Sequence, residues 1–158
     1  MRSVKMKGRK LLVIDLQPAF KIEPYYSKIL DYIAQNKNKY SEIVATRYFN
    51  KPGTAIHDKL GYEGAMKKEN LKFEYDYLID KSEYSVDYGI LKEKFEGCDV
   101  DIVGCDTDAC ILATCYTMFK HKIDFKILSE YCYSSGGKTY HINSLEIIKR
   151  NFGKDSVI

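Results

Sequence analysis

Tryptophan is absent from this sequence of 158 residues, and proline and histidine occur only three times each. The five cysteines form no CxxC pair, so the spacing that marks zinc sites and thioredoxin-like redox pairs is missing. An odd number of cysteines also cannot be fully paired within one chain. We therefore expect reduced thiols, and a fold that needs neither disulfides nor a structural metal.

Long hydrophobic runs and an excess of one charge are missing too. The first ten residues are basic, but the apolar stretch LLVI that follows ends at Asp15, which makes it too short for a signal-peptide core or a membrane span. The formal net charge is only +3, and no run of lysine or arginine is long enough to follow a phosphate backbone. We expect a cytoplasmic protein that binds neither membranes nor nucleic acid.

The chain does have enough apolar residues, 45% of the total, for one compact domain over residues 1–158. Apolar runs alternate with amphipathic stretches, which is typical of a mostly parallel sheet with helices on both faces. This pattern predicts a Rossmann-like α/β three-layer sandwich. The predicted strands are Lys10–Asp15, Glu42–Tyr48, Tyr77–Lys81, Val100–Cys105, Asp124–Ser129 and a short Ser156–Ile158. The predicted helices are Tyr25–Asn36, Ile90–Glu96, Asp108–His121 and Thr139–Asn151, the last one followed by Gly153 as its C-cap.

The stretch Asn50–Asn70 has weak periodicity and contains Pro52, Gly53, Gly61 and Gly64. It predicts a long excursion between the second and third strands, of the kind that often closes over a pocket. No internal repeat, low-complexity segment or linker divides the chain.

Three polar residues fall at the carboxyl end of a predicted strand or in the helix after it: Asp15, Lys81 and Cys110. In open α/β sheets, this edge is where ligands bind. An acid, a cation and a thiol can together form a nucleophile assembly. Each residue also has an ordinary structural explanation, because Asp15 could be a hydrogen-bonded carboxylate and Lys81 a solvated lysine.

The cysteines differ in their predicted roles. Thr107 and Asp108 are good N-cap types, so Cys110 should lie in the first turn of a helix, where backbone N–H groups favour a thiolate. Cys115 falls on the apolar stripe of that helix and is assigned to packing. Cys98 in a turn, Cys105 at a strand end and Cys132 in a loop are also interpreted as structural.

Three segments, VIDLQPAF, KSEYS and GCDTDACILAT, occur in the order and spacing of the signatures of the isochorismatase-like cysteine hydrolases, and over nearly its whole length the chain resembles that superfamily. The matching residues are Asp15, Gln17, Phe20, Lys81, Tyr84, Ser85, Gly104, Thr107 and Cys110. The resemblance implies that Asp15, Lys81 and Cys110 form a catalytic triad that hydrolyses a small amide or related C–N bond through a thioester on Cys110.

The same resemblance implies an oxyanion hole made by the backbone N–H groups of Asp106 and Cys110, and a non-proline cis peptide bond between Cys105 and Asp106. We place the substrate pocket at Gln17, Phe20, Tyr48, Tyr84 and Thr107, with Tyr25 and Tyr26 as further candidates. Packing in the core or on the surface is an equal alternative for each of these tyrosines. The expected partner is a small-molecule substrate. Members of the superfamily commonly assemble, so a homo-oligomer is expected by resemblance.

Departures from the family pattern bear on the substrate. Nicotinamidase-like members carry an Asp-x-His and a further His as metal ligands after the second strand, whereas this chain reads TRYFNKPGTAIH with only His57 nearby. We therefore predict no catalytic metal and no cofactor. Asp106 stands where small apolar residues are common, and its charge disfavours anionic substrates if the side chain faces the pocket. The alternative function is a non-catalytic or thiol-redox scaffold that keeps this fold.

Two other features are interpreted as structural. The string SSGGKTYH resembles a phosphate-binding loop, but that motif requires a glycine at position 132, where this chain has Cys132. His121 and His141 are single histidines on or near helices, where surface or core positions are more common than ligand positions.

Overall fold

The computed structural model describes residues 7–158, and its centre is a parallel sheet. The order across the sheet is β3-β2-β1-β4-β5, and every neighbouring pair is parallel. The strands are β1 (Lys7–Ile14), β2 (Glu42–Tyr48), β3 (Tyr77–Lys81), β4 (Cys98–Cys105) and β5 (Lys126–Tyr133). The predicted fold class is confirmed. Because the strand order reverses beside β1, a ligand crevice is expected where β1 and β4 end.

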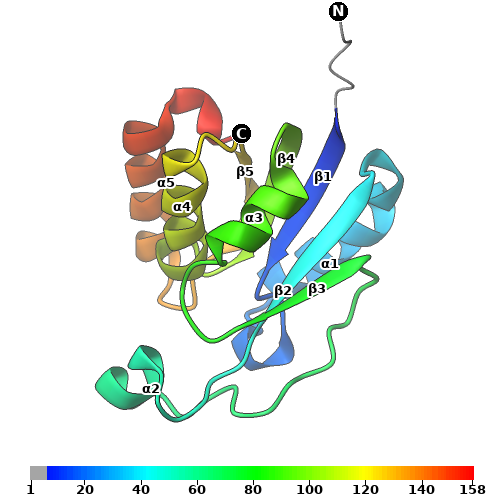
Figure 1. Ribbon diagram of the computed structural model, residues 1–158. Helices are drawn as coiled ribbons and strands as arrows, with labels where there is room; N and C mark the ends of the chain where they lie inside the picture. Colours follow the sequence, from blue (N-terminus) through cyan, green and yellow to red (C-terminus); the bar gives the residue numbers. More distant parts are fainter. Residues whose placement is uncertain (1–6) are drawn as a thin grey trace, which may run out of the picture.

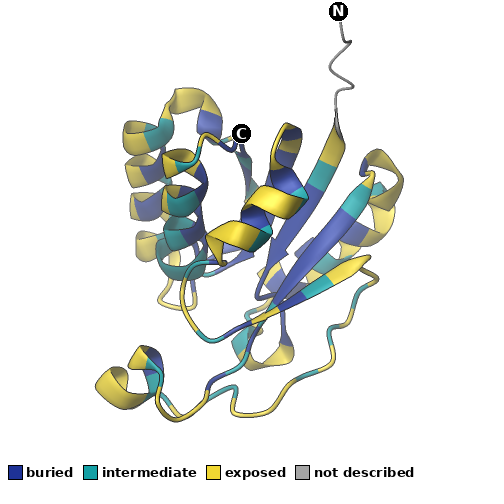
Figure 2. Cartoon of the chain, in the orientation of Figure 1, coloured by how far each residue is buried: buried dark blue, intermediate teal, exposed yellow. Residues whose placement is uncertain are grey.

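Helices cover both faces of the sheet (Figure 1). They are α1 (Tyr25–Asn36), α3 (Tyr88–Phe95), α4 (Leu112–Lys120) and α5 (Lys138–Phe152). A further short helix, α2 (Ala55–Leu60), lies in the excursion. Alternate residues of a strand face opposite sides, so Leu12 and Ile14 belong to the core under α3, α4 and α5, while Leu11 and Val13 belong to the core under α1. Both faces of β1 are therefore dry, and Figure 2 shows the central strands as a buried band.

Gly104 allows the ends of β1 and β4 to approach closely. Its φ of 120° is one that side-chain-bearing residues rarely adopt. A Cβ atom at this position would overlap the carbonyl oxygen of Ile14. The residues that directly follow the two strands are therefore held side by side.

Several predicted boundaries were wrong. β4 begins at Cys98, so this cysteine lies in a strand and not in a turn. β5 begins at Lys126 and continues to Tyr133, which places Cys132 in the strand. Its register with β4 shifts between Ile102 and Gly104. Polar residues at such an irregularity break the apolar pattern from which a strand is predicted.

The predicted last strand and the predicted excursion also differ from the structure. Ser156–Ile158 is not a regular strand, because Lys154–Ser156 form a 3-10 turn and only Val157 makes a parallel bridge, to Ile127. The excursion contains α2, a six-residue helix that ends at Gly61 in a left-handed conformation. So short a helix shows no clear periodicity in the sequence. Gly153 follows α5 as predicted.

Figure 1 shows α2, in the first half of the excursion, away from the helices that cover the sheet. Among the helices of residues 7–158, none has the length and apolar character needed to cross a membrane.

Candidate active site

Asp15 directly follows β1 and is buried, with 1% of its surface exposed. Its Oδ1 accepts a hydrogen bond from Thr46 Oγ1 at 2.6 Å, and its backbone N–H donates to the same hydroxyl oxygen at 3.0 Å. Its φ of 50° is unusual for a residue with a side chain and persists only where the surroundings impose it. Thr46, on β2, was not singled out by the sequence analysis, yet it fixes the orientation of Asp15.

Lys81, the last residue of β3, forms an ion pair with Asp15. Its Nζ lies 2.8 Å from Asp15 Oδ2 and donates to the carbonyl of Glu83 at 2.9 Å. This ammonium is the ion-pair partner of Asp15 Oδ2. Burial alone would lower the pKa of Lys81, but Asp15 and Cys110 together outweigh burial and raise the pKa. The lysine is therefore a cation at neutral pH.

Cys110 lies in a single π-helical turn, Thr107–Ile111, that leads into α4. The carbonyl of Asp106 accepts hydrogen bonds from the N–H groups of Ala109 and Ile111, both at 3.1 Å. In the part of the chain that the structure describes, the N–H of Cys110 between them makes no bond to this carbonyl. Wide turns of this kind occur often at functional sites. The turn therefore leaves the N–H of Cys110 out of the hydrogen bonds that Ala109 and Ile111 make to Asp106.

The Cys110 thiol is next to both members of the ion pair. Burial and the Asp15 carboxylate raise its pKa, and the Lys81 ammonium opposes them only in part. The expectation that the helix start favours a resting thiolate was therefore wrong, because burial and the neighbouring carboxylate have the larger effect. At neutral pH the group is a thiol, with a carboxylate beside it that can accept its proton.

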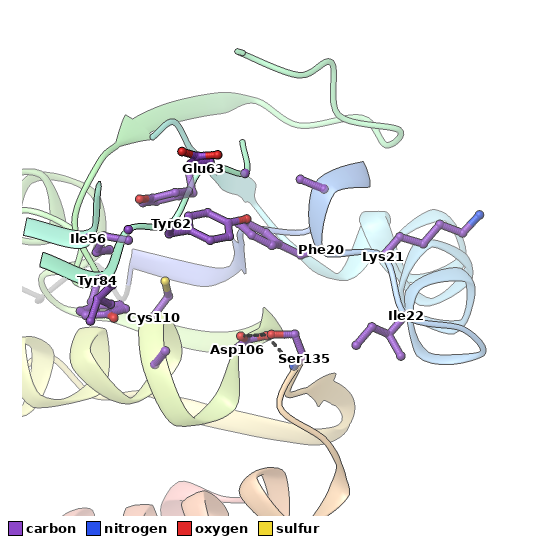
Figure 3. A pocket seen from close by; sticks show the side chains of 16 residues that line it. Phe20, Lys21, Ile22, Ile56, Tyr62, Glu63, Tyr84, Asp106, Cys110 and Ser135 are labelled. Carbon is purple, nitrogen blue, oxygen red and sulfur yellow. Dashed lines mark hydrogen bonds between the residues drawn. The ribbon is translucent and has the colours of Figure 1, made fainter. Parts of the chain in front are cut away.

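The sulfur of Cys110 faces a cavity of about 910 Å³. Figure 3 shows aromatic rings above the sulfur, with Tyr84 to one side and Asp106 on the same floor. The aromatic wall consists of Phe20, Tyr48, Tyr62 and Tyr84. Burial is the main cause that raises the pKa of Tyr48 to about 12, so this hydroxyl stays neutral.

Two residues that we placed in the pocket do not line this cavity, because their side chains are used elsewhere. Gln17 is fully buried behind the wall, where its amide donates to the carbonyl of Tyr48 at 3.0 Å and accepts from the Tyr48 N–H at 2.8 Å. Thr107 is also fully buried, and its hydroxyl lies 2.8 Å from His141 Nδ1. Tyr25 and Tyr26 are likewise not in the lining.

Two polar residues outside the cavity lining, Asn50 and Glu69, hold the excursion in place and were not predicted. The buried amide of Asn50 donates to the carbonyls of Tyr62 at 2.6 Å and Gly64 at 3.1 Å. The Glu69 carboxylate accepts from the Gln17 amide at 3.0 Å and from the Ala19 N–H. The Asn50 bonds close the excursion on itself, and the Glu69 bonds tie it to the residues that follow β1. A polar residue in an irregular segment gives no periodic signal, so the pattern could not reveal them.

Several solved structures with the same architecture are amidases or an isochorismatase-like hydrolase. An isochorismatase-like hydrolase from Alkaliphilus metalliredigens superposes with a TM-score of 0.73 at 18% identity, over 91% of this chain and 92% of that one. This chain has the isochorismatase-like fold. A pyrazinamidase/nicotinamidase from Streptococcus mutans matches with a TM-score of 0.75 at 15% identity, over 95% and 99% of the two chains. No protein-family model and no curated protein matches the sequence.

A third structure with the isochorismatase-like fold, the pyrazinamidase of Pyrococcus horikoshii, was solved in complex with zinc (TM-score 0.71, 21% identity, 94% and 96% of the chains). Residues 7–158 of the present chain contain no group of three or more His, Cys, Asp or Glu side chains that could hold a metal. His57 is engaged by Asp58, with its Nδ1 2.7 Å from the carboxylate. The residues present do not fit such a metal.

The non-proline cis peptide bond implied by the resemblance occurs between Cys105 and Asp106, as predicted.

Proposed function

We propose that this protein is a cysteine hydrolase that cleaves a small amide or related C–N bond without a metal ion, through a thioester on Cys110. The observation that carries the proposal is the buried pair of Asp15 and Lys81 beside the one thiol that lines the cavity. The other cysteines of the described chain are buried and do not line the cavity. The amidases among its structural relatives support this choice of bond.

The first half of the reaction begins with a proton transfer. The carboxylate of Asp15 takes the proton of the Cys110 thiol as the sulfur attacks the carbonyl carbon of the substrate. The carbonyl oxygen becomes an oxyanion, and the backbone N–H groups of Asp106 and Cys110 stabilise it. The C–N bond then breaks, the nitrogen takes the proton from Asp15, and ammonia or an amine leaves. Lys81 keeps the Asp15 carboxylate oriented throughout.

Water completes the reaction. Asp15 removes a proton from a water molecule, and the hydroxide adds to the thioester carbon. When the C–S bond breaks, the sulfur recovers its proton from Asp15 and the carboxylic acid is released. The net change is amide plus water to acid plus ammonia or amine, so the cycle needs no oxidant, reductant or cofactor.

Ammonia release from a panel of small amides tests the proposal. The wild type should release ammonia from at least one amide, and Cys110→Ala should release none. Cys115→Ala is the matched control, because Cys115 is a fully buried packing residue. A covalent adduct of substrate minus ammonia on Cys110, detected by mass spectrometry, would identify the thioester. Equal release from wild type and Cys110→Ala would overturn the proposal. Assembly into a homo-oligomer and a cytoplasmic location stay predictions.

A further inference from the structure

The carboxylate of Asp106 is held at the floor of the cavity by a single residue of a distant segment. Ser135 donates its backbone N–H to Asp106 Oδ1 at 2.8 Å and its hydroxyl to Oδ2. Figure 3 shows this pair on the floor that also carries Cys110. A carboxylate has about four acceptor positions, so two hydrogen bonds fix its orientation and still leave it able to accept from a ligand.

Among the described residues, this carboxylate has no lysine or arginine as a partner. Within residues 7–158, the ion pairs do not include Asp106. Lys21 is the only lysine or arginine in the cavity lining, and it pairs with Glu23 at 3.4 Å. In Figure 3 its side chain points away from the cavity floor. The lining also contains the exposed Glu63, so it holds two carboxylates and one lysine.

Aromatic rings complete the environment. The ring centroids of Phe20 and Tyr48 are 6.0 Å apart, and those of Tyr48 and Tyr62 are 6.4 Å apart, so these three rings of the aromatic wall adjoin one another. Burial raises the pKa of Tyr62, and the carboxylates of Glu69 and Asp106 add to the effect. Aromatic faces together with a carboxylate are the recurrent way in which proteins bind organic cations.

We propose that Asp106 is a specificity-determining residue and that the substrate is an amide bearing a positively charged organic group, which binds between the Asp106 carboxylate and the wall of Phe20, Tyr48 and Tyr62 while its carbonyl reaches Cys110. This inference rests on the proposed function for the reaction. For the positive charge of the substrate, it rests on the residues that line the cavity. Anionic amides are excluded by the same carboxylate.

Three benzamides of similar size separate charge from shape. They carry a 4-trimethylammonio, a 4-tert-butyl or a 4-carboxylate group, and the first two are nearly isosteric. For the wild type, we expect kcat/KM for the cation to exceed that for the tert-butyl compound by about tenfold, and the anion to be the poorest. In Asp106→Asn the ratio of cation to neutral compound should fall about tenfold. Asp108→Asn removes an equal charge two residues away, from a carboxylate that accepts from Ser134 and does not line the cavity, and should preserve the ratio.

Binding separates this inference from the hydrolase proposal. In Cys110→Ala, calorimetric titration with the same compounds should show tighter binding of the cation than of its isostere, and adding Asp106→Asn should abolish the difference. Such binding without turnover in the wild type would contradict only the hydrolase proposal. Equal affinity for the two isosteres would overturn the cation site, and this comparison does not depend on Asp106→Asn being folded.

Discussion

The sheet edge and the excursion face each other across one cavity but are built in opposite ways. At the sheet edge, Asp15, Thr46 and Lys81 are buried and held by short hydrogen bonds and an ion pair. The excursion is largely exposed (Figure 2) and is tied down through a few polar side chains such as Asn50. We infer that the buried residues at the sheet edge carry out the reaction, while the exposed excursion shapes the substrate pocket.

Removing the cation from the buried edge should have the largest effect. Lys81→Met leaves the Asp15 carboxylate buried without its partner, so we expect a loss of about 3 to 5 kcal/mol in the free energy of unfolding. Ammonia release should fall by at least about 100-fold because the base is no longer oriented. Denaturant unfolding and steady-state kinetics measure the two effects. Lys72→Met, at an exposed position just after the excursion, should change neither, and retained activity in Lys81→Met would contradict the proposed role of the pair.

Thr46→Val sharpens the comparison by removing only the hydroxyl that orients Asp15. It deletes the bonds to Oδ1 and from the backbone N–H, at a cost of about 1.5 to 3 kcal/mol for a bond to a charged group. We expect kcat to fall about tenfold, which corresponds to roughly 1.4 kcal/mol in the barrier, with little change in KM. Thr46→Ser keeps the hydroxyl and should restore kcat. A Thr46→Val enzyme with wild-type kcat would show that Asp15 needs no support from β2.

Removing the Asp15 carboxylate should change the alkylation rate of Cys110 and the rate of ammonia release in opposite directions. Because burial and Asp15 raise its pKa, alkylation of wild-type Cys110 by iodoacetamide should increase with pH through neutrality and beyond pH about 8.5, where a free thiol is half ionised. Asp15→Asn removes the carboxylate and keeps the Lys81 cation, so the pKa of the thiol falls. Alkylation at pH 7 should then be faster while ammonia release is lost.

Peptide mapping by mass spectrometry identifies Cys110 as the alkylated residue. Slower alkylation in Asp15→Asn than in the wild type would mean that Lys81, and not Asp15, dominates the field at the sulfur.

The smallest effect is expected for a substitution in the excursion. Asn50→Ala leaves the carbonyls of Tyr62 and Gly64 without their donor, which loosens the excursion by about 1 to 3 kcal/mol. KM should increase several-fold while kcat stays close to the wild-type value, because the buried edge is unchanged. Asn70→Ala, at an exposed position of the same excursion, serves as the control. A loss of kcat equal to that of Thr46→Val would mean that the two regions do not act separately.

This contrast also explains what the sequence could predict. The strands of the buried edge have a strong apolar signal, so β1 to β4 and the positions of Asp15 and Lys81 at strand ends followed from the pattern. The motif around Cys110 added the cis bond before Asp106, which the structure contains. Thr46 could not be singled out, because a hydroxyl inside an apolar strand gives no sign of its partner 31 residues away.

The excursion was harder to predict for a physical reason. Its bonds join single polar side chains to backbone groups far along the chain, as Glu69 does with Ala19. The direction of the Asp106 carboxylate likewise depends on Ser135, 29 residues later. Such contacts exist only in the folded chain and leave no periodicity in the sequence.

The position of Lys81 has a consequence for how the protein loses activity. β3 is an edge strand, bonded on one side only to β2, and edge strands can detach by local opening while a core stays folded. Detachment of β3 would withdraw Lys81 from Asp15 and leave the apolar centre of the sheet in place. The rate of hydrolysis would then depend on whether β3 is paired with β2. Mild denaturant would abolish turnover at a concentration where the circular dichroism of the helices and the sheet is still native.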